Sequence, residues 1–127
     1  MEFFISYSSK DKELASKIGE MLSQKYSVFL AHRDISMSKE WRDDILSHLE
    51  SCSVLIAVCT SNYANSAWGN QEAGIAIEKG RKVIPLFAQG TNKSRFGFLE
   101  AKQGHPHEFT EQNLKNIVND VIKAVTP

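Results

Sequence analysis

The stretch Val54-Leu55-Ile56-Ala57-Val58 is an unbroken apolar run near the middle of the chain. A strand with one face in water alternates apolar and polar residues, whereas a parallel strand covered by helices on both faces is apolar throughout. The run therefore predicts a central strand of a parallel sheet. Helix-forming segments flank it on both sides, which is typical of an α/β domain.

Shorter apolar runs on both sides of this stretch predict further strands. They occupy residues 3–5, 28–30, 83–87 and 107–109, the last being the least regular. Segments with apolar residues at helical spacing separate the strands, at residues 14–22, 41–49, 67–79 and 114–125. Gly80 follows the third of these segments as a stop signal. Pro85 cannot donate to a strand ladder, so we expect its strand to end or bulge there.

Strands that alternate with helices through short links predict a parallel sheet with helices on both faces. The expected architecture is a flavodoxin-like three-layer α/β domain with a five-stranded parallel sheet in the order 2-1-3-4-5. In that order the switch point of the sheet lies between the first and third strands, and ligands of such sheets bind outside the carboxyl ends of the strands at that point. Residues 6–10 and 60–68 are expected to meet there, so the topology alone predicts where a site lies.

The length of 127 residues suits one domain, and residues 1–127 are interpreted as a single unit, either alone or as the N-terminal domain of a longer protein. The 15 basic and 15 acidic residues balance, which argues against broad attraction to nucleic acid or an anionic membrane. No apolar run reaches the ~18 residues of a membrane span, and no signal peptide is apparent, so we expect a cytoplasmic location. The four histidines lack metal-site spacing, and Cys52 and Cys59 are expected to be reduced and buried.

The stretch Ser66-Ala67-Trp68-Gly69-Asn70-Gln71-Glu72 lies at the start of the third predicted helix. Trp68 and Glu72 are four residues apart, so they share one helix face. Spacing alone leaves two interpretations open: a core tryptophan with a solvated first-turn acid, or functional side chains at the predicted ligand crevice. The stretch Phe4-Ile5-Ser6-Tyr7-Ser8-Ser9-Lys10-Asp11 is likewise either a capped turn or a polar rim suited to a phosphate.

These two stretches resemble sequence boxes of TIR (Toll/interleukin-1 receptor) domains. The first is similar to the opening box of the family, and the second to its Ser-x-Trp-x-x-x-Glu box. Between them, the pattern Trp41, Ile45, Leu49 leading into the central apolar run resembles the second helix of the family and the strand after it. The resemblance covers nearly the whole chain and is nearest to the prokaryotic, NAD-consuming branch.

Enzymes of that branch cleave the bond between nicotinamide and ribose, so the resemblance implies NAD+ as substrate, with no cofactor and no metal. It implies Glu72 as the catalytic carboxylate and Trp68 as a wall of the pocket. The other substrate-binding residues it implies are Ser6, Tyr7, Ser8, Arg33, Asp34, Ile35 and Ser66. Nicotinamide leaves as a neutral molecule from a cationic pyridinium, so one carboxylate that stabilises the oxocarbenium character of the ribose can be enough.

Two features depart from the family pattern. The segment before Trp41 has no glycine, which bears on the shape of the loop after the second strand, and Gly69 stands where a cysteine is frequent. The rival hypothesis is a non-catalytic signalling or adaptor module that acts by TIR–TIR association. Both hypotheses imply self-association, a sensor domain or partner protein, and a role in immune, antiviral or cell-death signalling. The two can also coexist, because TIR enzymes commonly need association to complete the pocket.

Overall fold

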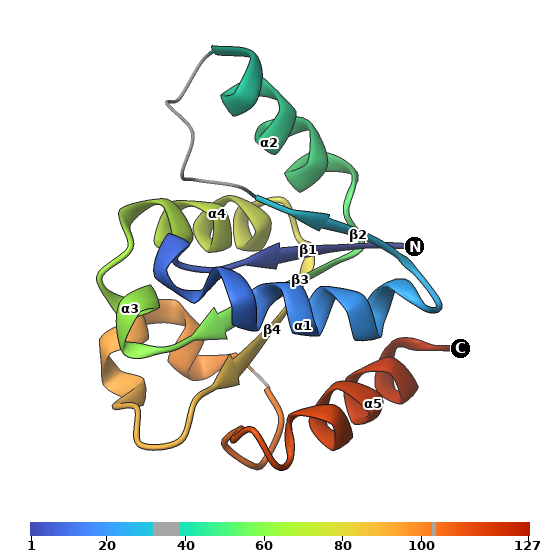
Figure 1. Cartoon of the computed structure of the whole chain (residues 1–127). Helices are drawn as coiled ribbons and strands as arrows, with labels where there is room; N and C mark the ends of the chain where they lie inside the picture. Colours follow the sequence, from blue (N-terminus) through green and yellow to red (C-terminus); the bar gives the residue numbers. More distant parts are fainter. Residues whose placement is uncertain (32–38, 103) are drawn as a thin grey trace.

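A computed structural model describes residues 1–31, 39–102 and 104–127 of the chain. Its centre is a parallel sheet of β1 (Glu2–Ser6), β2 (Ser27–Leu30), β3 (Val54–Cys59) and β4 (Lys82–Phe87). The order within the described residues is β2-β1-β3-β4, and helices cover both faces of the sheet (Figure 1). This arrangement confirms the flavodoxin-like fold class and the first four positions of the predicted strand order.

The helices alternate with the strands: α1 (Lys12–Ser23), α2 (Lys39–Ser51), the short α3 (Ser61–Ala64), α4 (Ala67–Glu78) and α5 (Leu114–Val125). Two 3₁₀ segments, η1 (Ser9–Asp11) and η2 (Lys93–Ala101), complete the described elements. Gly80 has a φ of 73°, a conformation that glycine adopts without strain, and α4 ends just before it as predicted. Within the described ranges, no helix is long and apolar enough to cross a membrane.

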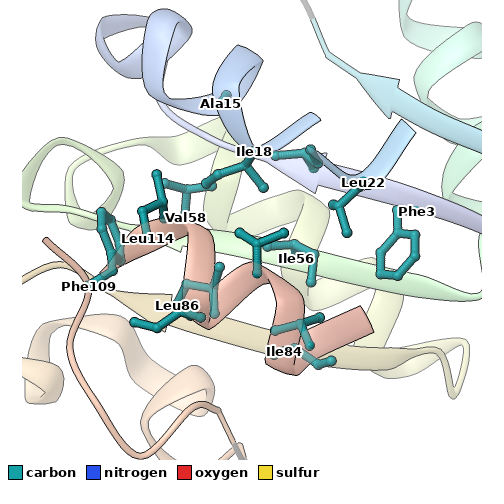
Figure 2. Close-up of a cluster of buried hydrophobic side chains, with 14 of the residues drawn as sticks. Phe3, Ala15, Ile18, Leu22, Ile56, Val58, Ile84, Leu86, Phe109 and Leu114 are labelled. Atoms are coloured by element: carbon teal, nitrogen blue, oxygen red, sulfur yellow. The ribbon is translucent and has the colours of Figure 1, made fainter. Parts of the chain in front are cut away.

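Successive residues of β1 face opposite layers of the molecule. Phe3 and Ile5 pack with α1 and α5 in one apolar cluster, part of which is drawn in Figure 2. Phe4 packs in a second cluster with residues of α2, α3 and α4. Because side chains alternate along a strand, Ser6 points into the same layer as Phe4. The last residue of β1 is therefore directed towards α4, the helix that carries Glu72.

The predicted fifth strand at residues 107–109 is replaced by one parallel bridge between Ala88 and Phe109. The Phe109 N–H donates to the Phe87 carbonyl at 2.9 Å, and the Gln89 N–H donates to the Phe109 carbonyl at 3.0 Å. Phe109 buries its ring in the cluster of α1 and α5, whereas His107 is exposed. Only one residue of the segment has an apolar side chain to place on the sheet, so regular pairing does not extend beyond it.

The expectation that β4 ends or bulges at Pro85 was wrong. The register runs without interruption from Val54↔Lys82 through Ala57↔Pro85 to Cys59↔Phe87. The Pro85 carbonyl lies against Gly104, where an added Cβ would stand 2.3 Å from the oxygen, so the polar groups of Pro85 face away from β3. A proline at the outer edge of a sheet costs no ladder hydrogen bond, because its missing N–H would not have pointed at the neighbouring strand.

Candidate functional site

Two strands and two helices meet at one end of the sheet. β1 and β3 pair in parallel from Phe3↔Val54 to Ser6↔Ala57, so their carboxyl ends lie side by side. α3 begins two residues after β3 ends, and α4 follows α3 directly. This is the position at which α/β sheets bind ligands, between strands whose connections leave in opposite directions.

A buried contact at this place joins Ser6 and Glu72, which are 66 residues apart in the sequence. The Ser6 Oγ lies 2.7 Å from the Glu72 Oε1, and the hydroxyl donates to the carboxylate. The two residues are 0% and 1% exposed, respectively. A carboxyl group in such a position is held by its neighbours rather than by solvent, unlike an ordinary first-turn acid on a helix surface. The alternative of a solvated acid is thereby wrong.

Tyr63 on α3 extends this contact. Its hydroxyl lies 2.8 Å from the Ser6 Oγ and donates to the Gly69 carbonyl oxygen, also at 2.8 Å. Tyr63 is completely buried. The sequence around Tyr63 does not mark it as functional, because a tyrosine in a turn-rich segment has no periodicity. Its position directly after β3, at the predicted ligand crevice, was the one signal that could have found it.

The start of α3 is tied to the segment after β1 through Asp11. The Thr60 Oγ1 donates to Asp11 Oδ2 at 2.5 Å, and the Asn62 Nδ2 donates to Asp11 Oδ1 at 3.1 Å. Thr60 also caps α3, since its hydroxyl oxygen accepts from the Tyr63 N–H at 3.2 Å. One carboxylate thus fixes the cap residue and the helix that presents Tyr63.

Ser66 has a local structural role in addition to the substrate contact that the family resemblance implies for it. It is the N-cap of α4, and its hydroxyl oxygen accepts from the Gly69 N–H at 3.1 Å. Trp68, in the first turn of the same helix, is half-buried. Both residues lie within two turns of Glu72, so the helix brings this part of the predicted set together.

The remaining residues of the predicted set fall in three places. Tyr7 is buried in the cluster with α1 and α5, on the opposite layer from Ser6. Ser8 is buried and caps η1, where its hydroxyl oxygen accepts from the Lys10 N–H at 3.3 Å. Arg33, Asp34 and Ile35 lie outside the described residues. The adjacent residues Ser6 and Tyr7 therefore lie in different layers of the molecule.

The described part of the chain contains no group of three histidine, cysteine or acidic side chains that could hold a metal ion. The two cysteines are buried free thiols. Burial raises the pKa of the Cys59 thiol far above its ordinary value, and burial also raises the pKa of Cys52, against a smaller opposing effect of Arg81. Both thiols are therefore neutral and poor nucleophiles at physiological pH.

A hollow of about 720 Å³ lies between the start of α1 and the segment before α5. Its walls carry mixed charges, among them Lys17, Glu111 and Lys115. It lies in the layer of α1 and α5, whereas Glu72 lies in α4 on the other layer and does not line it. The hollow is therefore separate from the site around Glu72.

Comparison with known proteins gives a consistent result. The family model described as "TIR domain" matches residues 3–118. The TIR domain of the Toll-related receptor TRR-2 from Hydra magnipapillata aligns with a TM-score of 0.73 and 13% identity, over 96% of this chain and 95% of that one. The TIR domains of the activated Roq1 resistosome, which recognises the pathogen effector XopQ, align with a TM-score of 0.74 and 13% identity, over 98% and 99%. No curated protein matches the chain by sequence.

Proposed function

Because the chain belongs to the TIR domain family, we propose that it cleaves NAD+ between nicotinamide and ribose, with Glu72 as the catalytic carboxylate. The observation that supports this proposal is the buried contact between Ser6 and Glu72 at the carboxyl ends of β1 and β3. A carboxyl group withdrawn from solvent is costly to keep unless something requires it there. Buried ionisable groups at the crevice of an α/β sheet are accordingly candidates for function.

The chemistry needs few groups. The substrate carries a positive charge on its pyridinium ring, and the charge moves onto the ribose as the bond to neutral nicotinamide breaks. A carboxylate beside the ribose stabilises that cation, and it does so more strongly in a site from which water is excluded. Trp68, half-buried one turn before Glu72, offers an aromatic face for the pyridinium or the adenine.

Access to Glu72 defines the condition for activity. With the side chain 1% exposed, substrate reaches the carboxyl only after neighbouring groups rearrange. We propose that self-association of the domain provides this rearrangement, as part of immune or cell-death signalling in the cytoplasm. A dilute single copy is then expected to be nearly inactive, while copies held close together turn over.

The burial of Glu72 also favours a second candidate, a signalling module that acts by TIR–TIR contact without turnover. In that case the Ser6–Glu72 contact is structural and only stabilises α4 against β1. The two candidates differ in whether the carboxylate is needed for nicotinamide release, so one substitution separates them.

The test follows nicotinamide release from NAD+ by protein clustered at high density on a bead surface. Wild type should turn over, and Glu72→Gln should lose roughly 10²-fold or more, the usual cost of removing transition-state charge stabilisation. The matched control is Glu78→Gln, because Glu78 is an exposed acid in the last turn of the same helix.

Circular dichroism of each variant shows whether the fold is kept. If clustered wild type and Glu72→Gln are equally inactive and both folded, the enzyme proposal fails and the interaction module is favoured. For an active protein, the ribosyl product distinguishes hydrolysis, in which water captures the cation, from cyclisation, in which another atom of the substrate does.

A further inference from the structure

Ser6 is the last residue of β1, and its hydroxyl lies between two side chains that come from α3 and α4. The Ser6 Oγ donates to the Glu72 Oε1 at 2.7 Å and lies 2.8 Å from the Tyr63 hydroxyl oxygen. We propose that Ser6 is a positioning residue, which acts through Glu72 by holding its carboxylate oriented and ionised, rather than a residue that binds the substrate. The proposal changes the role that the family resemblance implies for Ser6, and it rests on the proposed function of Glu72.

The place of Ser6 in the sheet makes its hydroxyl a fixed point. Ser6 is 0% exposed and pairs in register with Ala57 of β3, so the sheet holds its backbone. One rotatable bond separates this backbone from the hydroxyl oxygen, and its staggered positions are few. The position adopted directs the oxygen at Glu72, with the ring of the buried Tyr63 beside it. The hydroxyl is therefore held by the strand rather than by the group that it contacts.

Glu72 needs such a fixed point because its side chain is long. Three rotatable bonds separate a glutamate carboxyl group from the backbone, and ordering them costs conformational entropy. The contact with Ser6 fixes Oε1 and so limits the rotation of the group before substrate arrives. A carboxylate accepts hydrogen bonds at both of its oxygen atoms, so this contact can persist while the group meets a ribosyl cation. A carboxylate oriented in advance stabilises that cation without reorganising during the reaction.

The direction of the hydrogen bond also favours the charged form of Glu72. A hydroxyl that donates to a carboxylate stabilises the ionised form, whereas burial favours the neutral acid. Ser6 therefore opposes the effect of burial and maintains the form that the proposed chemistry requires. Removing the Ser6 hydroxyl moves the balance towards the neutral acid whatever else the carboxyl group contacts, because the substitution removes a single donor.

Other titratable groups at this end of the sheet do not alter the comparison on which a test rests. Cys59, at the end of β3, is a neutral thiol because burial raises its pKa. Asp11 accepts hydrogen bonds from α3, and Lys10 and Lys12 are exposed on η1 and α1. A Ser6→Ala substitution changes none of these charges, so its effect on Glu72 reports the lost hydroxyl.

The activity test compares wild type and Ser6→Ala in the clustered protein, with NAD+ as the substrate. Ser6→Ala should lower kcat by roughly 10-fold and change KM by less than about 2-fold, because the lost contact orients the carboxylate and not the substrate. The acidic limb of the kcat/KM profile should move to higher pH, since a larger fraction of Glu72 is then neutral. Ser23→Ala is the control, because it removes a serine hydroxyl that contacts the Glu20 carbonyl at the end of α1. A residue that binds substrate would instead raise KM and leave the acidic limb in place.

A second measurement needs no turnover. NMR of protein carrying ¹³C-labelled glutamate follows the Glu72 carboxyl group, with its signal assigned by its absence in Glu72→Gln. The titration midpoint should rise by about one unit in Ser6→Ala, the usual effect of losing a hydrogen bond to a charged group. Ser6→Thr keeps a hydroxyl on the same carbon and should keep the midpoint near that of wild type, as should Ser23→Ala. Circular dichroism of each variant shows whether the fold is kept.

The outcomes separate the two proposals. An unchanged midpoint in folded Ser6→Ala, or a raised KM with the kcat of wild type, overturns the positioning role of Ser6. A midpoint that rises as expected in a protein that releases no nicotinamide would support the contact between Ser6 and the carboxylate and contradict the NAD proposal.

Discussion

Gly69 lies against the ring of Tyr63 so closely that a Cβ on Gly69 would stand 2.6 Å from the Tyr63 Cε1 atom. Gly69 has no positive φ, so the glycine serves close approach rather than an unusual backbone conformation. The approach lets the Tyr63 hydroxyl reach both the Gly69 carbonyl and Ser6. In the family pattern a cysteine is frequent at this position, and here its absence makes room for the tyrosine.

We predict that Gly69→Ala lowers the free energy of unfolding by about 1–3 kcal/mol, the usual cost of overpacking a core. The added methyl group has to displace the Tyr63 ring, and the higher helix propensity of alanine offsets only part of the cost. Urea denaturation measures the change. Gly74→Ala is the control on the same helix, where a Cβ meets nothing within 4 Å and should stabilise by roughly 0.5–1 kcal/mol. Equal stability of the two variants would contradict the close packing described here.

The Asp11 carboxylate should matter more than its partly exposed position suggests. Asp11→Ala removes both hydrogen bonds from Thr60 and Asn62, and we expect a loss of about 1–3 kcal/mol, because these bonds are made to a charged group. The same variant should reduce nicotinamide release in clustered protein, since α3 presents Tyr63. Denaturation and turnover are measured in parallel with Asp43→Ala, an exposed acid on α2. An Asp11→Ala protein as stable as this control would show that the α3 anchor is unimportant.

Ser66 can be tested for two roles by two substitutions. Ser66→Ala removes the side chain that caps α4 and should cost about 1 kcal/mol, whereas Ser66→Asp keeps a good cap and should retain stability. If Ser66 also binds substrate, both variants should raise KM in the active protein, because neither keeps the hydroxyl. A KM that rises only in the alanine variant would leave capping as the sole role of Ser66.

The buried thiol of Cys59 predicts a dependence of stability on alkaline pH. Its pKa in the folded protein is raised above the ordinary value of 9.0, so the unfolded chain loses this proton first as the pH rises. The contribution to stability is fully present below pH 9 and is lost above it, with a slope of at most about 1.4 kcal/mol per pH unit. Urea denaturation between pH 8 and 10.5 measures the slope in wild type and in Cys59→Ala. Identical slopes in the two proteins would refute the assignment.

Local sequence patterns determined most of the framework. Val54–Val58 is a buried parallel strand because only a strand covered on both faces accommodates an unbroken apolar run. The last helix spans Leu114–Val125, as its apolar spacing predicts, and Gly80 ends α4 because glycine alone adopts its φ without strain. These features depend on residues within a few positions of each other, so the linear pattern carries them.

Local sequence patterns could not predict which segments pair as strands. Residues 107–109 had strand-like composition, yet only Phe109 found a place beside Ala88. Pro85 looked like a strand end, yet its polar groups face the sheet edge, where a proline costs nothing. Whether a strand continues depends on which side its neighbour occupies, and no local pattern records that.

At the candidate site too, some features follow from the sequence and others only from the tertiary structure. The sequence by itself pointed to Glu72, Ser6 and the end of the sheet where they lie. Only the tertiary structure decided that Ser6 faces Glu72 while Tyr7 faces the opposite layer, and that Tyr63 joins them. Ser6 comes within hydrogen-bond distance of Tyr63 and Glu72, which are 57 and 66 positions away in the sequence, because the sheet, α3 and α4 bring them together. The energy of such contacts depends on distance in space rather than along the chain.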